Sequence, residues 1–434
     1  MSGEPFRKLA IVLGLEGSFR RKVLAVVLGL ATAGIGCETL QSGANPALPL
    51  WVHRPNGAMN VVVRRKVTIA ERTSGEDYEH GSAEIDPIRR RVFVGSSDGG
   101  LYALRADDAR GLWRFETLGP VQTEPLYDAG EDVVYFGSND GALYKVAAFD
   151  GKLIWRFATN AEVARRPVLK NGLLYVVNAN DTIVAIEAAT GKMRWTQHRR
   201  PAFGMEIAGY AGPLVTEDRV YVAFSDGRVA AYDPVDGSER WPLVDLSAEA
   251  EHSQGDVPRY LDVDTTPIAD RITAGHVVYV ASYAGGVFAL DASNGGRVWV
   301  NDRTTGVTQL VLWQQPAHQP RDGVGPPISP RKLLLASSGT TGLWALSTED
   351  GREVWRRALP DGGVSAPVPI AGAVMVTTTR YGVFLFSPVD GGVIDGLDLS
   401  NGVTMIPAVY GRRAFVMSNA GVLLGIHVDP PGGL

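Results

Sequence analysis

Between residues 91 and 428 the chain repeats one pattern of hydrophobic and polar positions. Six copies have an apolar run, a tight turn, an alternating run, a Gly-containing turn and a short strand ending in Trp, as in RVFVGSSDGGLYALRADDARGLWRF (91–115). Asp-Gly pairs such as Asp98-Gly99 supply the positive φ that a tight hairpin turn requires. Apolar runs bounded by such turns predict antiparallel β-strands.

A further short strand opens each copy and is its first strand. It is a short apolar segment, often with proline, ahead of the first run: TEPLY, RRPVL, AGPLV, TTPIA, SAPVP and MIPAV. The Trp residues that close the copies are separated by 42, 40, 46, 58 and 56 residues: Trp113, Trp155, Trp195, Trp241, Trp299 and Trp355. Asp395 occupies the equivalent position 40 residues later. Four strands in a repeat of about 40–50 residues are typical of a β-propeller blade.

The strand count predicts how the ring closes. Eight copies of the second and third strands are present, but only seven copies of the fourth. A spare strand lies ahead of the repeats, NVVVRRKVTIAE (60–71). We therefore predict an all-β, eight-bladed β-propeller with four antiparallel strands per blade, in which the N-terminal strand completes the last blade and removes exposed sheet edges. A Pro/Gly-rich insertion at 314–332 falls between a first and a second strand.

Composition narrows the function only slightly. Hydrophobic residues make up 45% of the chain, glycine is frequent at 51 residues, and the net charge of −5 offers no basic footprint for nucleic acid. The seven histidines are dispersed without metal-ligand spacing, and the single cysteine, Cys37, excludes an internal disulfide.

The segment from 19 to 37 has basic residues, then small and apolar residues, and ends on Cys37. This is a secretory signal pattern and is too short for a spanning helix. It resembles a bacterial lipoprotein signal, with Gly34 where such signals usually have Leu; the alternative is a plain signal or anchor with an incidental cysteine. We predict a lipoprotein-type signal peptide at 1–36, lipidation of Cys37, a tether at 37–58 and the propeller at 59–434.

The repeats carry a family resemblance. ALDASNGGRVW (289–299), AIEAATGKMRW and ALSTEDGREVW resemble the pyrroloquinoline-quinone-type propeller repeat. Together with the lipoprotein-like start and the run LDVDTTPIAD (261–270), they resemble the BamB family most closely. The resemblance implies a non-catalytic scaffold without a cofactor, anchored at the periplasmic face of the outer membrane. Its implied partners are a POTRA domain of BamA, other components of the β-barrel assembly machinery and unfolded outer-membrane protein clients.

Two segments correspond to the partner-binding segments of that family. Asp262 and Asp264 match its Asp-x-Asp pair, and Met205 and Ile207 match the apolar positions of a Leu-x-Leu-Arg loop, with Ala208 at the arginine position. Both segments connect the fourth strand of one blade to the first strand of the next. Such connections share one face of a propeller, so we expect the segments to be neighbours. Strand alternation would place both carboxylates on one side and Val263 on the other.

Other interpretations of these residues stay open. The Asp pair could cap backbone N–H groups, whereas a metal site would need more oxygen ligands and catalysis would need partners that the sequence does not place nearby. Met205 and Ile207 could pack into their own blade rather than contact a partner. No catalytic, cofactor-binding or metal-binding residue is assigned. The alternative functions are a quinoprotein dehydrogenase-like enzyme and a propeller scaffold of another envelope complex.

Overall fold

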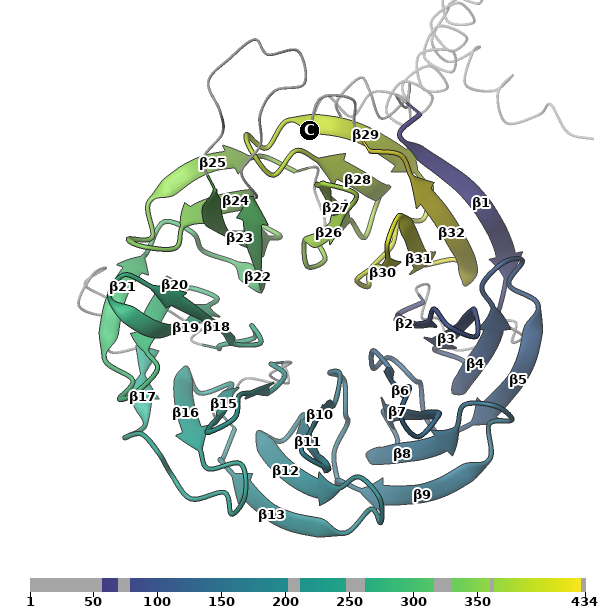
Figure 1. Ribbon diagram of the computed structural model, residues 1–434, viewed down its shortest axis with the longest axis horizontal. Coiled ribbons are helices and arrows are strands. Elements are labelled where there is room, and N and C mark those ends of the chain that lie inside the picture. The colour runs from purple at the N-terminus through teal and green to yellow at the C-terminus, as the bar shows by residue number, and fades with distance from the viewer. Residues whose placement is uncertain are drawn as a thin grey trace, which may run out of the picture. The chain divides into compact units, whose positions relative to one another are not determined.

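The computed structural model describes residues 57–68, 79–201, 211–246, 262–315, 330–359 and 363–430. Its contacts separate residues 1–50 from residues 51–434, and all the described residues belong to the second unit. In that unit eight four-stranded antiparallel sheets are arranged around a central hole (Figure 1). The predicted eight-bladed β-propeller is therefore confirmed.

Each blade runs from an inner strand at the hole to an outer strand at the circumference. The inner strands are β2 (Ala83–Asp86), β6 (Leu126–Asp128), β10 (Val168–Lys170), β14 (Leu214–Val215), β18 (Ile268–Ile272), β22 (Val307–Gln315), β26 (Val368–Ile370) and β30 (Ala408–Tyr410). The second strands are β3 (Arg91–Gly95), β7 (Val133–Ser138), β11 (Leu173–Asn178), β15 (Val220–Ala223), β19 (Gly275–Ser282), β23 (Arg331–Ser338), β27 (Ala373–Thr377) and β31 (Arg413–Met417). We number the blades 1 to 8 in this order.

The third strands are β4 (Gly100–Arg105), β8 (Ala142–Ala147), β12 (Thr182–Glu187), β16 (Arg228–Tyr232), β20 (Gly286–Asp291), β24 (Gly342–Ser347), β28 (Gly382–Phe386) and β32 (Val422–Val428). The outer strands are β5 (Gly111–Glu116), β9 (Leu153–Ala158), β13 (Met193–His198), β17 (Val244–Asp245), β21 (Arg297–Asn301), β25 (Glu353–Arg357), β29 (Val393–Asp398) and, in blade 8, β1 (Met59–Lys66). β1 pairs antiparallel with β32, with Met59 opposite Val428. The predicted closure by the N-terminal strand is thus confirmed.

Two faces of the ring differ in the turns they carry. The connections between blades hydrogen-bond to the turns between second and third strands: Val121 N donates to Ser96 O at 2.9 Å, and Val403 N donates to Thr378 O at 2.8 Å. We call this side the connection face. The opposite side carries the turns between first and second strands and between third and fourth strands, and we call it the turn face.

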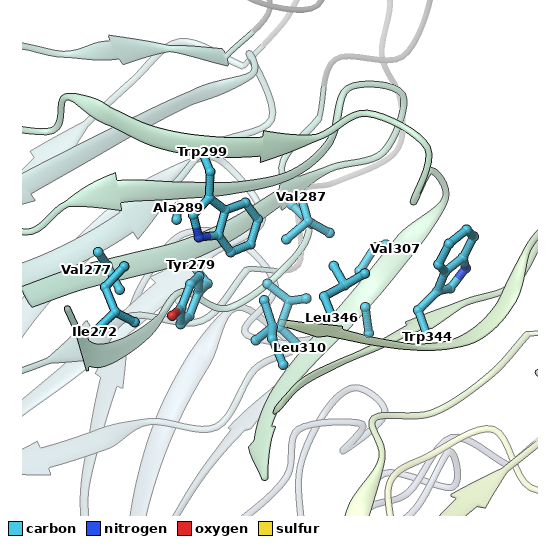
Figure 2. Packing of buried hydrophobic residues seen from close by; sticks show 13 residues of the cluster. Ile272, Val277, Tyr279, Val287, Ala289, Trp299, Val307, Leu310, Trp344 and Leu346 are labelled. Atoms are coloured by element: carbon cyan, nitrogen blue, oxygen red, sulfur yellow. The ribbon is translucent and has the colours of Figure 1, made fainter. Parts of the chain in front are cut away.

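Apolar packing between neighbouring blades forms the core. Between blades 5 and 6, Trp299 and Tyr279 pack with Val307, Leu310 and Leu346 (Figure 2). The repeated tryptophans join each blade to the next, because the indole Nε1–H donates to a carbonyl in the next blade's turn between third and fourth strands. The pairs are Trp113–Ala148, Trp155–Ala188, Trp195–Pro234, Trp241–Ala292, Trp299–Thr348 and Trp355–Pro388, at 2.9–3.1 Å.

The structure corrects three details of the predicted strands. Trp113 is the third residue of β5, so the outer strand extends beyond the tryptophan instead of ending there. In blade 4 the outer strand is displaced to Val244–Asp245. The cause is Pro242, which follows Trp241 and has no N–H to continue the ladder. β1 ends at Lys66, and residues 69–71 of the predicted strand lie outside the described residues.

Candidate partner-binding face

The connection between blades 4 and 5 is fixed by the hairpins on either side of it. Val263 N donates to Phe224 O at 3.3 Å in blade 4, and Tyr283 N of blade 5 donates to Asp262 O at 3.0 Å. The Thr265 hydroxyl accepts a hydrogen bond from Ala281 N at 2.8 Å. Backbone contacts with both blades therefore set the position of Asp262 and Asp264.

The strand alternation expected for these two carboxylates is wrong, because β18 starts only at Ile268, after Pro267. Without strand alternation, Asp262 and Val263 are both buried: Asp262 is 5% exposed and Val263 is fully enclosed. None of the described residues donates a hydrogen bond to Asp262 Oδ1. Asp264 is half-buried, with its Oδ1 atom enclosed, and is therefore the more accessible carboxylate of the pair.

The connection that precedes blade 4 lies beside the one that carries Asp264. Gly212 N donates to Thr266 Oγ1 at 2.9 Å, which joins the ends of the two connections. Ala211, Val263 and Leu246 pack in the same apolar cluster. Met205, Ile207 and Ala208 lie outside the described residues, so their place beside Asp264 stays a prediction.

Charged side chains surround this part of the connection face. Arg199 Nη2 donates to Asp226 Oδ2 at 2.7 Å, and Arg228 Nε donates to Asp245 Oδ2 at 3.1 Å. Burial raises the pKa of Asp181, although hydrogen bonds from Ser225 oppose this shift. Two aspartates in this sector are thus held by arginines, and a third is buried against a hydroxyl group. This network was not predicted, because it depends on the packing of blade 3 on blade 4 and on the displaced outer strand of blade 4.

One exposed apolar residue on the connection face was also missed. Leu118, in the connection between blades 1 and 2, is 94% exposed, and its backbone N donates to Asp140 Oδ2 at 3.3 Å. The signal in the sequence is a large apolar residue placed directly before Gly119 and Pro120, where the chain leaves an outer strand. An exposed leucine held in place by its backbone is suited to contact another surface.

The described residues show no metal-site geometry, since no three His, Cys, Asp or Glu side chains among them cluster closely enough to hold an ion. In the same part of the chain, we find no helix with the length and apolar character needed to cross a membrane.

The comparisons with known sequences agree on one family. A family model described as outer membrane protein assembly factor BamB matches residues 127–312 and 302–428. The chain is 28% identical over 233 residues to the outer membrane protein assembly factor BamB of Legionella pneumophila, covering 54% of each chain. It is 24% identical over 250 residues to that of Yersinia pestis, covering 51% of this chain and 61% of the relative. The matches thus span little more than half the length of these relatives.

Solved structures with similar folds include proteins of different function. The BamB structure from Moraxella catarrhalis aligns with a TM-score of 0.66 at 18% identity, covering 85% of this chain and 99% of the other. The quinohemoprotein alcohol dehydrogenase from Comamonas testosteroni aligns with a TM-score of 0.60 at 13% identity, covering 87% of this chain and 77% of the other. At these identities the structural matches establish the fold and not the activity.

Proposed function

Because the chain belongs to the family described as outer membrane protein assembly factor BamB, we propose that it is a non-catalytic scaffold of the β-barrel assembly machinery. The names of the Legionella and Yersinia relatives support a role in assembling outer-membrane proteins. In this proposal the propeller is a rigid adaptor that presents its connection face to partner proteins, and it uses no cofactor.

The partner proposed for this face is a POTRA domain of BamA. The observation that carries the proposal is the hydrogen bond between Gly212 and Thr266, because it brings together the two inter-blade connections that contain the predicted binding residues. Asp264 would supply the acidic contact, and Met205 and Ile207 the apolar ones. The burial of Asp262 assigns it a supporting role in shaping the loop.

Charge reversal at Asp264 tests this docking. We expect Asp264→Arg to lower the recovery of BamA from solubilised membranes at least tenfold, on the order of a lost charged contact. The arginine would repel the basic groups of the partner that Asp264 is proposed to contact. The measurement is affinity capture with the full-length protein, followed by quantitative immunoblotting or mass spectrometry of BamA. Asp262 is left intact, since an arginine at this buried position would destabilise the fold.

The matched control is Asp302→Arg, which makes the same change at an exposed residue of the next inter-blade connection. It should leave BamA recovery unchanged. Equal recovery of BamA by the Asp264→Arg variant and the unaltered protein would refute the docking proposal. Equal losses with Asp264→Arg and Asp302→Arg would also contradict it, because the change in overall charge would then explain the loss of BamA.

We also propose that Cys37 is lipidated and holds the propeller at the periplasmic face of the outer membrane. The basic and apolar residues that precede Cys37 support this anchor. Cys37→Ser should abolish incorporation of radiolabelled palmitate, because the thiol that would carry the lipid is absent. Label in the Cys37→Ser protein, or no label in the unaltered protein, would refute lipidation at Cys37.

An enzymatic role is the competing proposal, because a quinohemoprotein dehydrogenase has the same fold. It predicts quinone absorbance in the purified protein and dye-linked oxidation of alcohols. The scaffold proposal predicts neither, and a single preparation distinguishes the two.

A further inference from the structure

The central hole contains a cavity of about 520 Å³ lined by inner strands from both sides of the ring closure. Glu84 of β2, Glu124 just before β6 and Arg166 just before β10 form a charged side, and β26, β30 and the residues just before β30 form an apolar side. Figure 1 shows that these inner strands border the hole. A second cavity of about 220 Å³ shares Ile85, Pro87 and Tyr410 with the first and opens toward the turn face. The two cavities adjoin each other, and we call them together the passage.

One inner-strand position breaks the pattern of the other seven blades. Glu84 pairs with Phe93, and the corresponding register position in the other inner strands always holds an aliphatic residue. These residues are Leu126, Val168, Leu214, Ile268, Val311, Val368 and Ala408. An apolar residue at this position would satisfy the fold, so the carboxylate of Glu84 is not explained by packing.

Glu84 takes part in an ion cluster that spans three blades. Arg166 Nη1 lies 2.6 Å from Glu84 Oε2 and 2.7 Å from Glu124 Oε1, and Arg166 Nη2 donates to Glu84 Oε1 at 3.1 Å. Two carboxylates and one guanidinium leave a net charge of −1. Burial raises the pKa of Glu84, although Arg166 opposes this shift, so the negative charge is held in a poorly solvated place.

The opposite side of the larger cavity is apolar and ends in an exposed aromatic residue, whereas the smaller cavity is also lined by Arg90 and Arg413. Ile406, Pro407 and Val409 line the larger cavity. Tyr410, at the end of β30, is 60% exposed where the passage reaches the turn face. A cavity with an apolar wall and a few converging charged groups is the usual form of a ligand site.

We propose that this passage binds an extended peptide segment with a Lys or Arg side chain next to an aromatic or aliphatic one. The cationic group would contact Glu124 and neutralise the remaining charge of the cluster, while the apolar side chain would pack on Ile406 and Tyr410. An extended chain suits the site, because an inner strand of three residues is about 10 Å long, which three to four extended residues can span. Glu124 is the more exposed of the two carboxylates and therefore the first contact.

The test uses the full-length protein and a fluorescein-labelled peptide, Ser-Gly-Phe-Lys-Leu-Gly-Ser, with a matched peptide in which norleucine replaces Lys. Fluorescence anisotropy should give a Kd on the order of 100 µM or tighter for the Lys peptide. The norleucine peptide should bind about tenfold more weakly, because it lacks the charge but keeps the length and the apolar groups.

Two variants of the passage complete a double-mutant cycle. Glu124→Gln should weaken the Lys peptide about tenfold but leave the norleucine peptide unchanged, because only the Lys peptide loses a charged contact. Tyr410→Ala should weaken both peptides. The control is Glu217→Gln, the same chemical change at an exposed residue outside the cavity, and it should alter neither affinity. Circular dichroism of each variant confirms that the ring is folded.

Failure of the Lys peptide to bind at about 1 mM, which is on the order of ten times the expected Kd, would overturn the proposal. Equal binding of the two peptides to the unaltered protein would also overturn it, as would equal effects of Glu124→Gln on the two affinities. Butylammonium is the final arm. Displacement of the peptide by an equal concentration of butylammonium would also overturn the proposal, because the amine alone would then account for the binding. These measurements do not depend on BamA capture. A negative result with the peptides would therefore leave the docking proposal unaffected, and a negative capture result would leave the peptide proposal unaffected.

Discussion

Replacing Asp395 with leucine is expected to destabilise the protein by about 2–3 kcal/mol, because a buried N–H at the ring closure would lose its acceptor. Asp395 is fully buried, its Oδ2 accepts the backbone N–H of Met59 at 2.8 Å, and its Oδ1 accepts that of Gly396 at 2.9 Å. Met59 is the first residue of β1, so this carboxylate holds the strand that completes blade 8. Urea unfolding gives the free energy, and hydrogen exchange at Met59–Lys66 should report faster local opening.

The matched variants at this position are asparagine and tryptophan. Asp395→Asn keeps one acceptor oxygen and should cost less than leucine. Asp395→Trp restores the residue found at this position in six other blades but should still destabilise the protein, since blade 8 has no turn between its third and fourth strands to accept the indole N–H. If Asp395→Trp were as stable as the unaltered protein, the proposed role of the carboxylate in closure would be wrong.

The second large effect is expected at Trp299, where truncation to alanine should cost about 3–5 kcal/mol. Trp299 is 8% exposed, its Nε1 donates to Thr348 O at 3.0 Å, and its ring centroid lies 5.5 Å from that of Tyr279. Gly351 covers the ring so closely that an added Cβ would lie 2.5 Å from the indole Cε3 atom. Alanine would leave a cavity between blades 5 and 6, in the packing shown in Figure 2.

Two further substitutions separate cavity formation from the hydrogen bond. Trp299→Phe fills most of the space but lacks the indole N–H, so we expect a loss of about 1–2 kcal/mol. Val300→Ala changes the next residue in β21, which is exposed, and should stay within about 0.5 kcal/mol of the unaltered protein. Equal stability of Trp299→Ala and Val300→Ala would show that the tryptophan does not join the blades.

Local pattern predicted the blades, since the tryptophans contact residues that are only 33–51 positions away in the sequence. The equivalence of Asp395 with the tryptophans was also visible, and it is confirmed by its pairing with Leu385. Its partner was not predictable, because Met59 is 336 residues away and meets it only through ring closure.

Contacts between blades explain why the sites were predicted less well. The burial of Asp262 depends on hairpins at Phe224 and Tyr283, so strand alternation was the wrong model for that segment. Arg166 and Glu84 are 82 residues apart and lie in blades that are not adjacent, so no local pattern links them. The sequence shows that residue 84 carries a carboxylate. Its position at the central hole follows only from the register of β2 with β3, which the sequence does not give.

The pairing of β1 with β32 also constrains the order in which the chain can fold. Asn60 and Asp429 side chains hydrogen-bond at 3.1 Å although 369 residues separate them. The segment that leaves the ribosome early must therefore wait for nearly the whole chain before its backbone finds a partner, and long-range pairing of this kind is slow. Until then both segments keep unpaired strand edges, which is the state most open to wrong association or to capture by a chaperone.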